Sequence, residues 1–211
     1  MRLLRNKFDK KLLSELPRAT FEGRIVVVQS EQEAQKAVDY LLKQPLLGFD
    51  TETRPTFRPG PMRPVSLLQV SAEDVCFLFR LCMIDLPDCL LPLFAQQGIT
   101  KIALSWADDT GQLRHRRHDI EMNGFIELQQ YVRFFGIEDA SLQKIYANLF
   151  GEKISKGQQL SNWETDVLSE AQKLYAATDA WACIRIYKEL EQLKRANDWQ
   201  LIKDDEETIS Q

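Results

Sequence analysis

The chain has 211 residues, a length typical of one domain that can bury a core without disulfide or metal cross-links. Apolar residues make up 44% and charged residues 27% of the sequence, values that exclude wholesale disorder. With 27 Lys and Arg against 31 Asp and Glu, the formal net charge is −4. This charge excludes a protein that coats nucleic acid over its whole surface, although it permits a local basic path.

No targeting or membrane signal is visible in the sequence. The N-terminal segment is charged and lacks the apolar region of a signal peptide, and no apolar run approaches the length of a membrane span. The cysteines show no metal-knuckle spacing, so we expect reduced thiols at Cys76, Cys82, Cys89 and Cys183. The sequence therefore predicts a cytoplasmic α/β protein with no membrane segment, and no protein partner can be read from it.

The chain divides into a main domain and two short terminal segments. Residues 1–23 carry leucines at helical spacing among Lys and Arg, and they predict a basic amphipathic helix that ends at Pro17. Such a helix packs on the domain or contacts nucleic acid or a partner, and both alternatives stay open. Residues 24–197 predict the main domain, and residues 198–211 predict an acidic tail.

Strands and helices alternate along the main domain. Runs of apolar and β-branched residues predict strands at residues 24–29, 46–52, 65–71, 75–81, 99–104 and 124–128. Helical periodicity predicts helices near residues 31–44, 85–97, 107–117, 129–135, 141–150 and 169–197. Ser30 with Glu33, and Ser169 with Gln172, predict capping boxes. The expected fold is α/β, with a central mixed sheet of five to six strands flanked by helices.

Asp50 and Glu52 lie two residues apart at the end of the apolar strand predicted at residues 46–52. Because side chains alternate along a strand, both carboxylates face the same side of the sheet. Two acids at the end of a buried strand are costly unless something neutralises them, and Mg²⁺ or Mn²⁺ prefers oxygen ligands. Ion pairs with Arg54 or Arg58 are the alternative.

Tyr175 and Asp179 lie four residues apart in the last predicted helix, so they share one face and are one turn apart. The neighbouring residues are mostly apolar, which indicates that much of this helix is buried. A phenol one turn before a buried Asp can hydrogen-bond an attacking water molecule. A tyrosine packed on the core with its hydroxyl at the rim is the alternative.

Asp108 and Asp109 lie at the start of the helix that follows residues 99–104. Acids at this position also complement the helix dipole, and spacing alone does not choose which one points toward Asp50 and Glu52. Acids on a strand end, a helix start and a late helix are the layout of a two-metal phosphoryl-transfer site. In such a site two cations roughly 3.5–4 Å apart activate a water and stabilise the leaving oxygen.

These residues resemble the DEDD superfamily of 3′-5′ exonucleases, within it the tyrosine-bearing branch that includes ribonuclease D and the Werner-syndrome helicase exonuclease domain. The resemblance covers about residues 24–193. Its motifs match residues 50–52, 101–113 and 172–180, with Lys156, Ser161 and Trp163 fitting a segment common in this branch. Alignment of the second motif places the metal-linked Asp of the family on Asp109.

The resemblance implies an RNase H-like fold and hydrolysis of nucleoside monophosphates from the 3′ end of DNA or RNA. It implies two divalent cations, Mg²⁺ or Mn²⁺, held by Asp50, Glu52, Asp109 and Asp179. Tyr175 would orient the attacking water. A non-catalytic nucleic-acid-binding relative of the same fold is the alternative function.

Candidate contacts to nucleic acid gather in two loops that flank the proposed ligands. Because the protein is net negative, the phosphate path must be local. The candidates are Arg54, Arg58 and Arg63 in the proline-rich loop, and Lys156, Ser161 and Trp163 before the last helix. The alternative is that these arginines pair with nearby acids such as Glu73 or Asp74.

Overall fold

The computed structural model describes residues 1–56 and 63–203, and its centre is a mixed six-stranded sheet. The strand order is β2-β5-β4-β3-β6-β7, in which β3-β4 and β4-β5 are antiparallel and the other neighbours are parallel. The strands are β2 (Arg24–Val28), β3 (Leu46–Glu52), β4 (Leu67–Ser71), β5 (Val75–Phe79), β6 (Thr100–Ala103) and β7 (Phe125–Glu127). The predicted α/β fold with a mixed sheet is confirmed.

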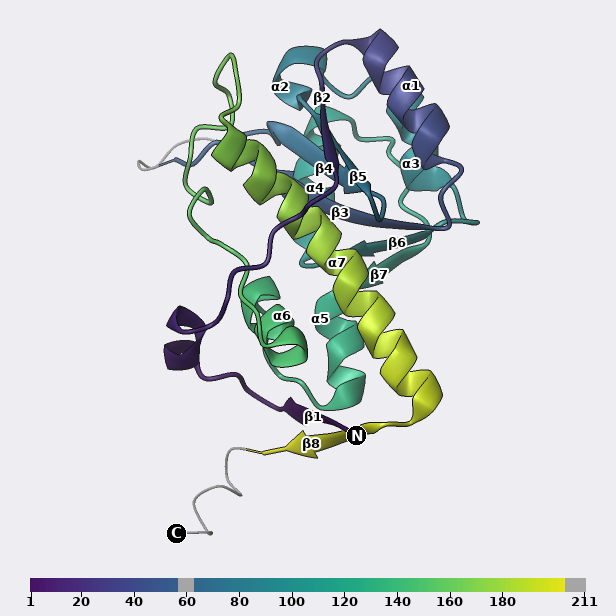
Figure 1. The fold of residues 1–211 in the computed structure, drawn as a ribbon. Helices are drawn as coiled ribbons and strands as arrows, with labels where there is room; N and C mark the ends of the chain where they lie inside the picture. The colour runs from purple at the N-terminus through teal and green to yellow at the C-terminus, as the bar shows by residue number, and fades with distance from the viewer. Residues whose placement is uncertain (57–62, 204–211) are drawn as a thin grey trace.

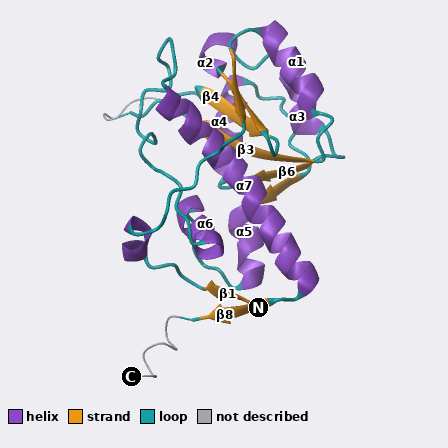
Figure 2. Ribbon diagram, in the orientation of Figure 1, coloured by secondary structure: helices purple, strands orange, loops and turns teal. Residues whose placement is uncertain are grey.

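Helices cover both faces of this sheet (Figures 1 and 2). The long helix α7 crosses one face, whereas α1, α3 and α4 pack on the other. The helices are α1 (Glu31–Leu41), α2 (Leu81–Ile84), α3 (Leu91–Ala95), α4 (Trp106–Arg116), α5 (Leu128–Tyr131), α6 (Leu142–Phe150) and α7 (Glu170–Ala196). Short 3-10 helices are η1 (Lys10–Ser14), η2 (Asp88–Leu90) and η3 (Val132–Phe135). Within the described ranges, no helix is both long and apolar enough to cross a bilayer.

Helix starts follow the sequence closely, because capping is a local property. Both predicted capping boxes are formed, by Ser30 with Glu33 at α1 and by Ser169 with Gln172 at α7. The helix predicted at residues 85–97 is shorter than expected. Asp85 adopts a positive φ of 55° and Pro87 is extended with a ψ of 158°, so helical structure begins only at Asp88. There η2 leads directly into α3, which ends at Ala95.

The amphipathic helix predicted at residues 1–23 is wrong. The chain instead forms strand β1 (Arg2–Arg5), which pairs in parallel with β8 (Trp199–Ile202), and then η1. Leu4 is fully buried while its neighbour Leu3 is 53% exposed, so burial follows the two-residue period of a strand. Backbone pairing with β8 outweighs the helical spacing of the leucines. Part of the predicted acidic tail is thus β8, and residues 204–211 lie outside the described residues.

The segment that follows η1 crosses α7 (Figure 1). It also hydrogen-bonds to the loop that follows α6, at Lys153. The backbone N–H of Ala19 donates to the Lys153 carbonyl, and the N–H of Lys153 donates to the Pro17 carbonyl, both at 2.9 Å. The N–H of Phe21 donates to the Thr178 hydroxyl at 3.1 Å. These bonds hold the start of a loop that reaches the candidate site.

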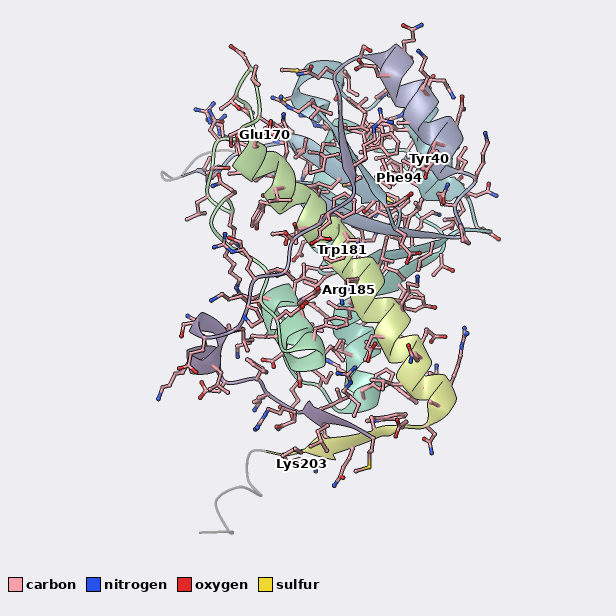
Figure 3. The ribbon with its side chains drawn as sticks, viewed as in Figure 1. Tyr40, Phe94, Glu170, Trp181, Arg185 and Lys203 are labelled. Carbon is pink, nitrogen blue, oxygen red and sulfur yellow. The ribbon has the colours of Figure 1, made fainter. Side chains whose placement is uncertain are left out.

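A cationic side chain joins α7 to α6. Arg185 lies about one turn beyond Trp181 on α7 (Figure 3). Its guanidinium lies over the rings of Phe150 and Trp181, 4.4 and 5.0 Å from their centroids. It also pairs with Glu152 at 3.5 Å. This contact holds the C-terminal half of α7 against the end of α6.

Helix α7 lies directly on strand β3 at Gly48. A Cβ atom at residue 48 would lie 2.0 Å from the Ala180 carbonyl oxygen, which belongs to the backbone and cannot move aside alone. The absence of a side chain at Gly48 therefore sets the spacing between helix and strand. Asp179 is the residue before Ala180, so the same contact positions it.

We predict that Gly48→Ala lowers the free energy of unfolding by about 1–3 kcal/mol, because the added methyl forces α7 away from β3. Gly111, on α4, is the matched control, since a Cβ there meets nothing within 4 Å. Gly111→Ala should be neutral or stabilise by up to about 1 kcal/mol. Urea denaturation of both variants measures the difference, and equal stabilities would contradict the close contact.

Candidate active site

Three carboxylates meet between the end of β3 and the middle of α7. Oxygen atoms of Asp50, Glu52 and Asp179 all lie within 4.8 Å of one another. Alternation along β3 turns Asp50 and Glu52 toward the face that α7 covers, and the approach of α7 at Gly48 brings Asp179 beside them. Residues 129 positions apart in the sequence thus form one acidic cluster.

The acidic cluster lies in a cleft of about 350 Å³. The end of β3, the starts of α4 and α6, the loop at residues 154–159 and α7 form its walls. Besides the cluster, its lining includes Asp109, Tyr175 and Lys156, which the sequence analysis assigned to the site. The four predicted acids, Tyr175 and Lys156 therefore all lie in one cleft.

Asp109 lies beside the acidic cluster, and a side chain of strand β3, which carries Asp50 and Glu52, holds it in place. The Thr51 hydroxyl donates to Asp109 Oδ1 at 2.6 Å, and one turn further along α4 the Thr53 hydroxyl donates to Gln112 Oε1 at 2.9 Å. Asp108 is exposed and does not line the cleft. The geometry thus favours Asp109 over its neighbour, which spacing alone could not decide.

A second acid holds the N-terminal end of α4. The Glu127 carboxylate accepts hydrogen bonds from the backbone N–H groups of Ser105 and Trp106, at 2.9 and 2.7 Å. Ser105 has a left-handed φ of 61°, a costly conformation for a residue with a side chain, and these bonds offset the cost. Glu127 therefore fixes the direction in which α4 leaves the sheet, and with it the position of Asp109.

The sequence analysis missed both of these positioning contacts. Thr51 could have been found, because alternation turns its side chain to the face opposite Asp50 and Glu52, where the next helix packs. Glu127 carried no local signal. It reaches Ser105 only because β7 pairs with β6, with Ala103 opposite Glu127.

Burial and mutual repulsion make the carboxyls of the site reluctant to ionise. Burial, reinforced by the other acids, raises the pKa of Asp50 well above its ordinary value. By the same causes the pKa of Glu52 rises to about 9. Burial raises the pKa of Asp179 to about 7 and that of Asp109 to about 6. At neutral pH the site therefore favours a cation or bound protons over free negative charge.

Tyr175 lies beside Asp179 with its ring against a buried indole. Its hydroxyl lowers the pKa of the Asp179 carboxyl, which partly offsets burial. Burial and the surrounding acids raise the pKa of Tyr175 itself far above its ordinary value, so the phenol stays protonated. Its ring packs tilted on Trp163, with centroids 6.0 Å apart. The hydroxyl is thus a neutral hydrogen-bonding group at the edge of the acidic cluster.

The donor set fits a hard divalent cation. Asp50, Glu52 and Asp179 offer carboxylate oxygens only, which Mg²⁺ and Mn²⁺ prefer. The alternative, in which Arg54 neutralises Asp50 and Glu52, is not what the structure shows. The Arg54 guanidinium pairs with Glu164 at 3.0 Å, and Arg58 lies outside the described residues.

The candidate nucleic-acid contacts separate into different environments. Arg54 and Arg63 both pair with Glu164, the second at 3.6 Å, so their acidic partner is neither Glu73 nor Asp74. Lys156 lines the cleft, and its Nζ donates to the Ser141 hydroxyl at 3.4 Å.

The two other candidates, Ser161 and Trp163, contact α7 and not the open cleft. The Ser161 hydroxyl accepts from Gln172 Nε2 at 3.1 Å, which ties the loop to the first turn of the helix. Trp163 is fully buried and packs under Tyr175. Its surface is therefore unavailable to a nucleic acid, and it holds the tyrosine in place instead.

The comparisons with known proteins show the family to which this fold and acidic cleft belong. Residues 25–194 match the 3′-5′ exonuclease family. The chain belongs to this family, which confirms the resemblance seen in the motifs. The match runs from β2 into the last turn of α7 and includes all four acids of the cleft.

Several relatives carry the same domain. The chain is 32% identical over 151 residues to the bifunctional 3′-5′ exonuclease/ATP-dependent helicase WRN of Mus musculus, covering 69% of this chain and 11% of that protein. It is 31% identical over 160 residues to exonuclease 3′-5′ domain-containing protein 2 of Drosophila melanogaster, covering 74% and 27%. The chain thus spans only a small part of the length of these relatives.

Solved structures share the fold. The Nibbler EXO domain of Aedes aegypti superposes with a TM-score of 0.75 and 22% identity, covering 84% of this chain and 94% of that one. Escherichia coli RNase D superposes with a TM-score of 0.71 and 19% identity, covering 83% and 46%. The conserved architecture is the RNase D-like α/β domain.

We predict that, with divalent cations removed by EDTA, the protein loses stability as the pH rises from about 5 to 9. Folded pKa values near 6, 7 and 9 for Asp109, Asp179 and Glu52 exceed the ordinary carboxyl value near 4. The folded state then holds protons that the unfolded chain has released, so raising the pH favours unfolding.

Thermal melts across this pH range test the prediction, and each kcal/mol lost lowers Tm by about 2–4 °C at this chain length. Asp179→Asn should flatten the slope, because it removes one of the titrating carboxyls and one of their repulsions. A Tm in EDTA that stays level or rises toward pH 9 would contradict the raised pKa values.

Proposed function

We propose that this chain is a divalent-metal-dependent 3′-5′ exonuclease that hydrolyses nucleoside monophosphates from the 3′ end of DNA or RNA. The observation that carries the proposal is the meeting of Asp50, Glu52 and Asp179 within 4.8 Å in an open cleft. Membership of the 3′-5′ exonuclease family supports it. The product of such a reaction is a nucleoside 5′-monophosphate and a shortened strand with a new 3′-hydroxyl.

Two cations would be bound by different sets of these acids. Asp50, Glu52 and Asp179 would bind one, and Asp50 would also bind the second with support from Asp109. Bound Mg²⁺ or Mn²⁺ would activate a water molecule and stabilise charge on the leaving 3′-oxygen. The Thr51 hydrogen bond to Asp109 suits a supporting role, because it leaves that carboxylate one oxygen for the site.

Tyr175 would orient the attacking water. Its phenol is protonated and lies beside Asp179, so its oxygen can accept from water while its proton is held by the carboxylate. Packing against the buried Trp163 restricts the ring, which lowers the entropy lost on aligning the water.

Substrate phosphates would enter past Lys156. This side chain lies on the cleft wall, and its charge acts on Asp179. Arg54 and Arg63 would add to the path by exchanging Glu164 for phosphate, and Arg58 remains a candidate of the same loop. Escherichia coli RNase D, which shares this fold, is an exoribonuclease, but a shared fold does not carry a substrate over to this chain. Our proposal therefore covers DNA and RNA.

The proposed compartment is the cytoplasm. Cys76, Cys82, Cys89 and Cys183 are all free thiols, a usage typical of a reducing environment. A non-catalytic relative that binds nucleic acid is the second candidate. The retention of all four acids and of Tyr175 around one cleft favours the enzyme.

Replacing one shared ligand tests the proposal. Asp50→Asn should abolish the Mg²⁺-dependent stepwise shortening of a 5′-labelled single strand, because Asp50 is the acid assigned to both cations. Asp108→Asn is the matched control, since this acid is adjacent to Asp109 yet exposed and outside the cleft. It should retain activity close to that of the parent.

Full activity of a folded Asp50→Asn protein would contradict the metal assignment. Binding of the same strand by the parent without any mononucleotide release, with Mg²⁺ or Mn²⁺ present, would favour the non-catalytic alternative. Blocking the 3′-hydroxyl separates the polarity, because a 3′-5′ enzyme then loses its entry point.

Tyr175→Phe removes only the hydroxyl and keeps the ring on Trp163. We predict a fall in kcat of about 10²-fold, the low end of what a positioned proton-transfer group contributes. KM should change little, because the hydroxyl acts on water and not on substrate. Steady-state kinetics on a labelled oligonucleotide measure both, and an unchanged kcat would leave Tyr175 a packing residue only.

A further inference from the structure

A glutamine with unpaired polar atoms lies beside the acidic cluster. Gln69, on β4, is completely buried, and neither its Nε2 nor its Oε1 has a hydrogen-bond partner. A buried amide group without partners costs about 1–3 kcal/mol for each unsatisfied group, so proteins seldom retain one without a use. Leu67, two residues earlier and on the same face of β4, shows that an apolar core residue fits this face.

The register of the sheet places Gln69 next to Asp50. The two residues are direct partners in the antiparallel β3-β4 pair, so their side chains point to the same face. Direct partners have Cβ atoms roughly 4.5–5.5 Å apart, and the longer glutamine side chain spans that distance. On the other side of Gln69, its partner on β5 is Leu78, which offers no polar group.

Two other polar side chains on this face of the sheet already have hydrogen-bond partners. The Ser71 hydroxyl donates to the Ala72 carbonyl at 2.7 Å, and the Cys76 thiol donates weakly to the Phe77 carbonyl at 4.0 Å. Helix α7 covers the face at Ala180 and excludes water. The Asp50 carboxylate is the polar group directly opposite Gln69 in the sheet.

We propose that Gln69 is a positioning residue for Asp50, whose carboxylate accepts a hydrogen bond from Gln69 Nε2 when a divalent cation occupies the site. The inference rests on the proposed function and deepens it. A carboxylate shared by two cations must present its oxygens in a fixed direction, and a neutral amide supplies that constraint without competing for the negative charge. The cation-free protein carries the cost of the unpaired amide, and the loaded protein recovers it.

The test uses Gln69→Met in the full chain, because methionine has a similar volume and no hydrogen-bonding amide. Leu68→Met is the matched control, since Leu68 is equally buried on the same strand and its side chain points to the opposite face. Calorimetric titration with Mn²⁺ at fixed pH measures the metal Kd of each protein. Thermal melts in EDTA measure the stability of each without metal.

We expect Gln69→Met to weaken Mn²⁺ binding by about 10-fold or more, as loss of an outer hydrogen bond to a metal ligand does. Its Tm in EDTA should equal or exceed that of the parent, because an unsatisfied amide has been removed. Leu68→Met should keep the parent Kd. A Kd within about 2-fold of the parent would overturn the proposal, whether or not Tm falls, because a purely structural role moves Tm alone.

A failure of the inference differs from a failure of the proposed function. If the parent binds Mn²⁺ and degrades nucleic acid but Gln69→Met binds Mn²⁺ equally well, only the role of Gln69 is wrong. If the parent itself binds no Mn²⁺, the proposed function fails and takes this inference with it. Should Gln69→Met not fold, Gln69→Asn, which withdraws the amide by one carbon, is judged by the same Kd criterion.

Discussion

The contact between helix α7 and the backbone of strand β3 at Gly48 brings the acidic cluster together and shields one side of it from water. Without a side chain at this position, the helix comes close enough to set Asp179 beside Asp50 and Glu52. The same closeness leaves three like-charged groups with little contact to water, and this burial together with their mutual repulsion raises their pKa values. The fold thus builds an electrostatic cost into its centre, and a divalent cation is the natural compensation.

Strand β3 uses its two faces for different tasks. Residues 50 and 52 point toward α7 and supply the ligands, whereas Thr51 points the other way and holds Asp109 through a 2.6 Å hydrogen bond. Glu127, on β7, then fixes the start of α4 by accepting hydrogen bonds from its first backbone N–H groups. One short strand therefore couples the acid from α4 to the acid from α7 through alternation alone.

Features set by local spacing could be predicted from the sequence, and features set by distant contacts could not. The Asp50 and Glu52 pair follows from the strand period, and the face shared by Tyr175 and Asp179 follows from the helix period. Pairing of β1 with β8 overrode the helical leucine pattern of the N-terminus, because the partner strand lies almost two hundred residues away. Glu127 and Gln69 act through strand register, which no single segment reveals.

The central claim is that the buried carboxyls hold protons until a cation displaces them. It is tested most directly by titrating the metal-free protein with Mn²⁺ near pH 7 in two buffers of different ionisation enthalpy, which yields the number of protons released per protein. The account predicts saturable binding with a net release of protons, because Glu52 and Asp179 have pKa values of about 9 and 7. Binding without proton release, or no binding at all, would contradict it.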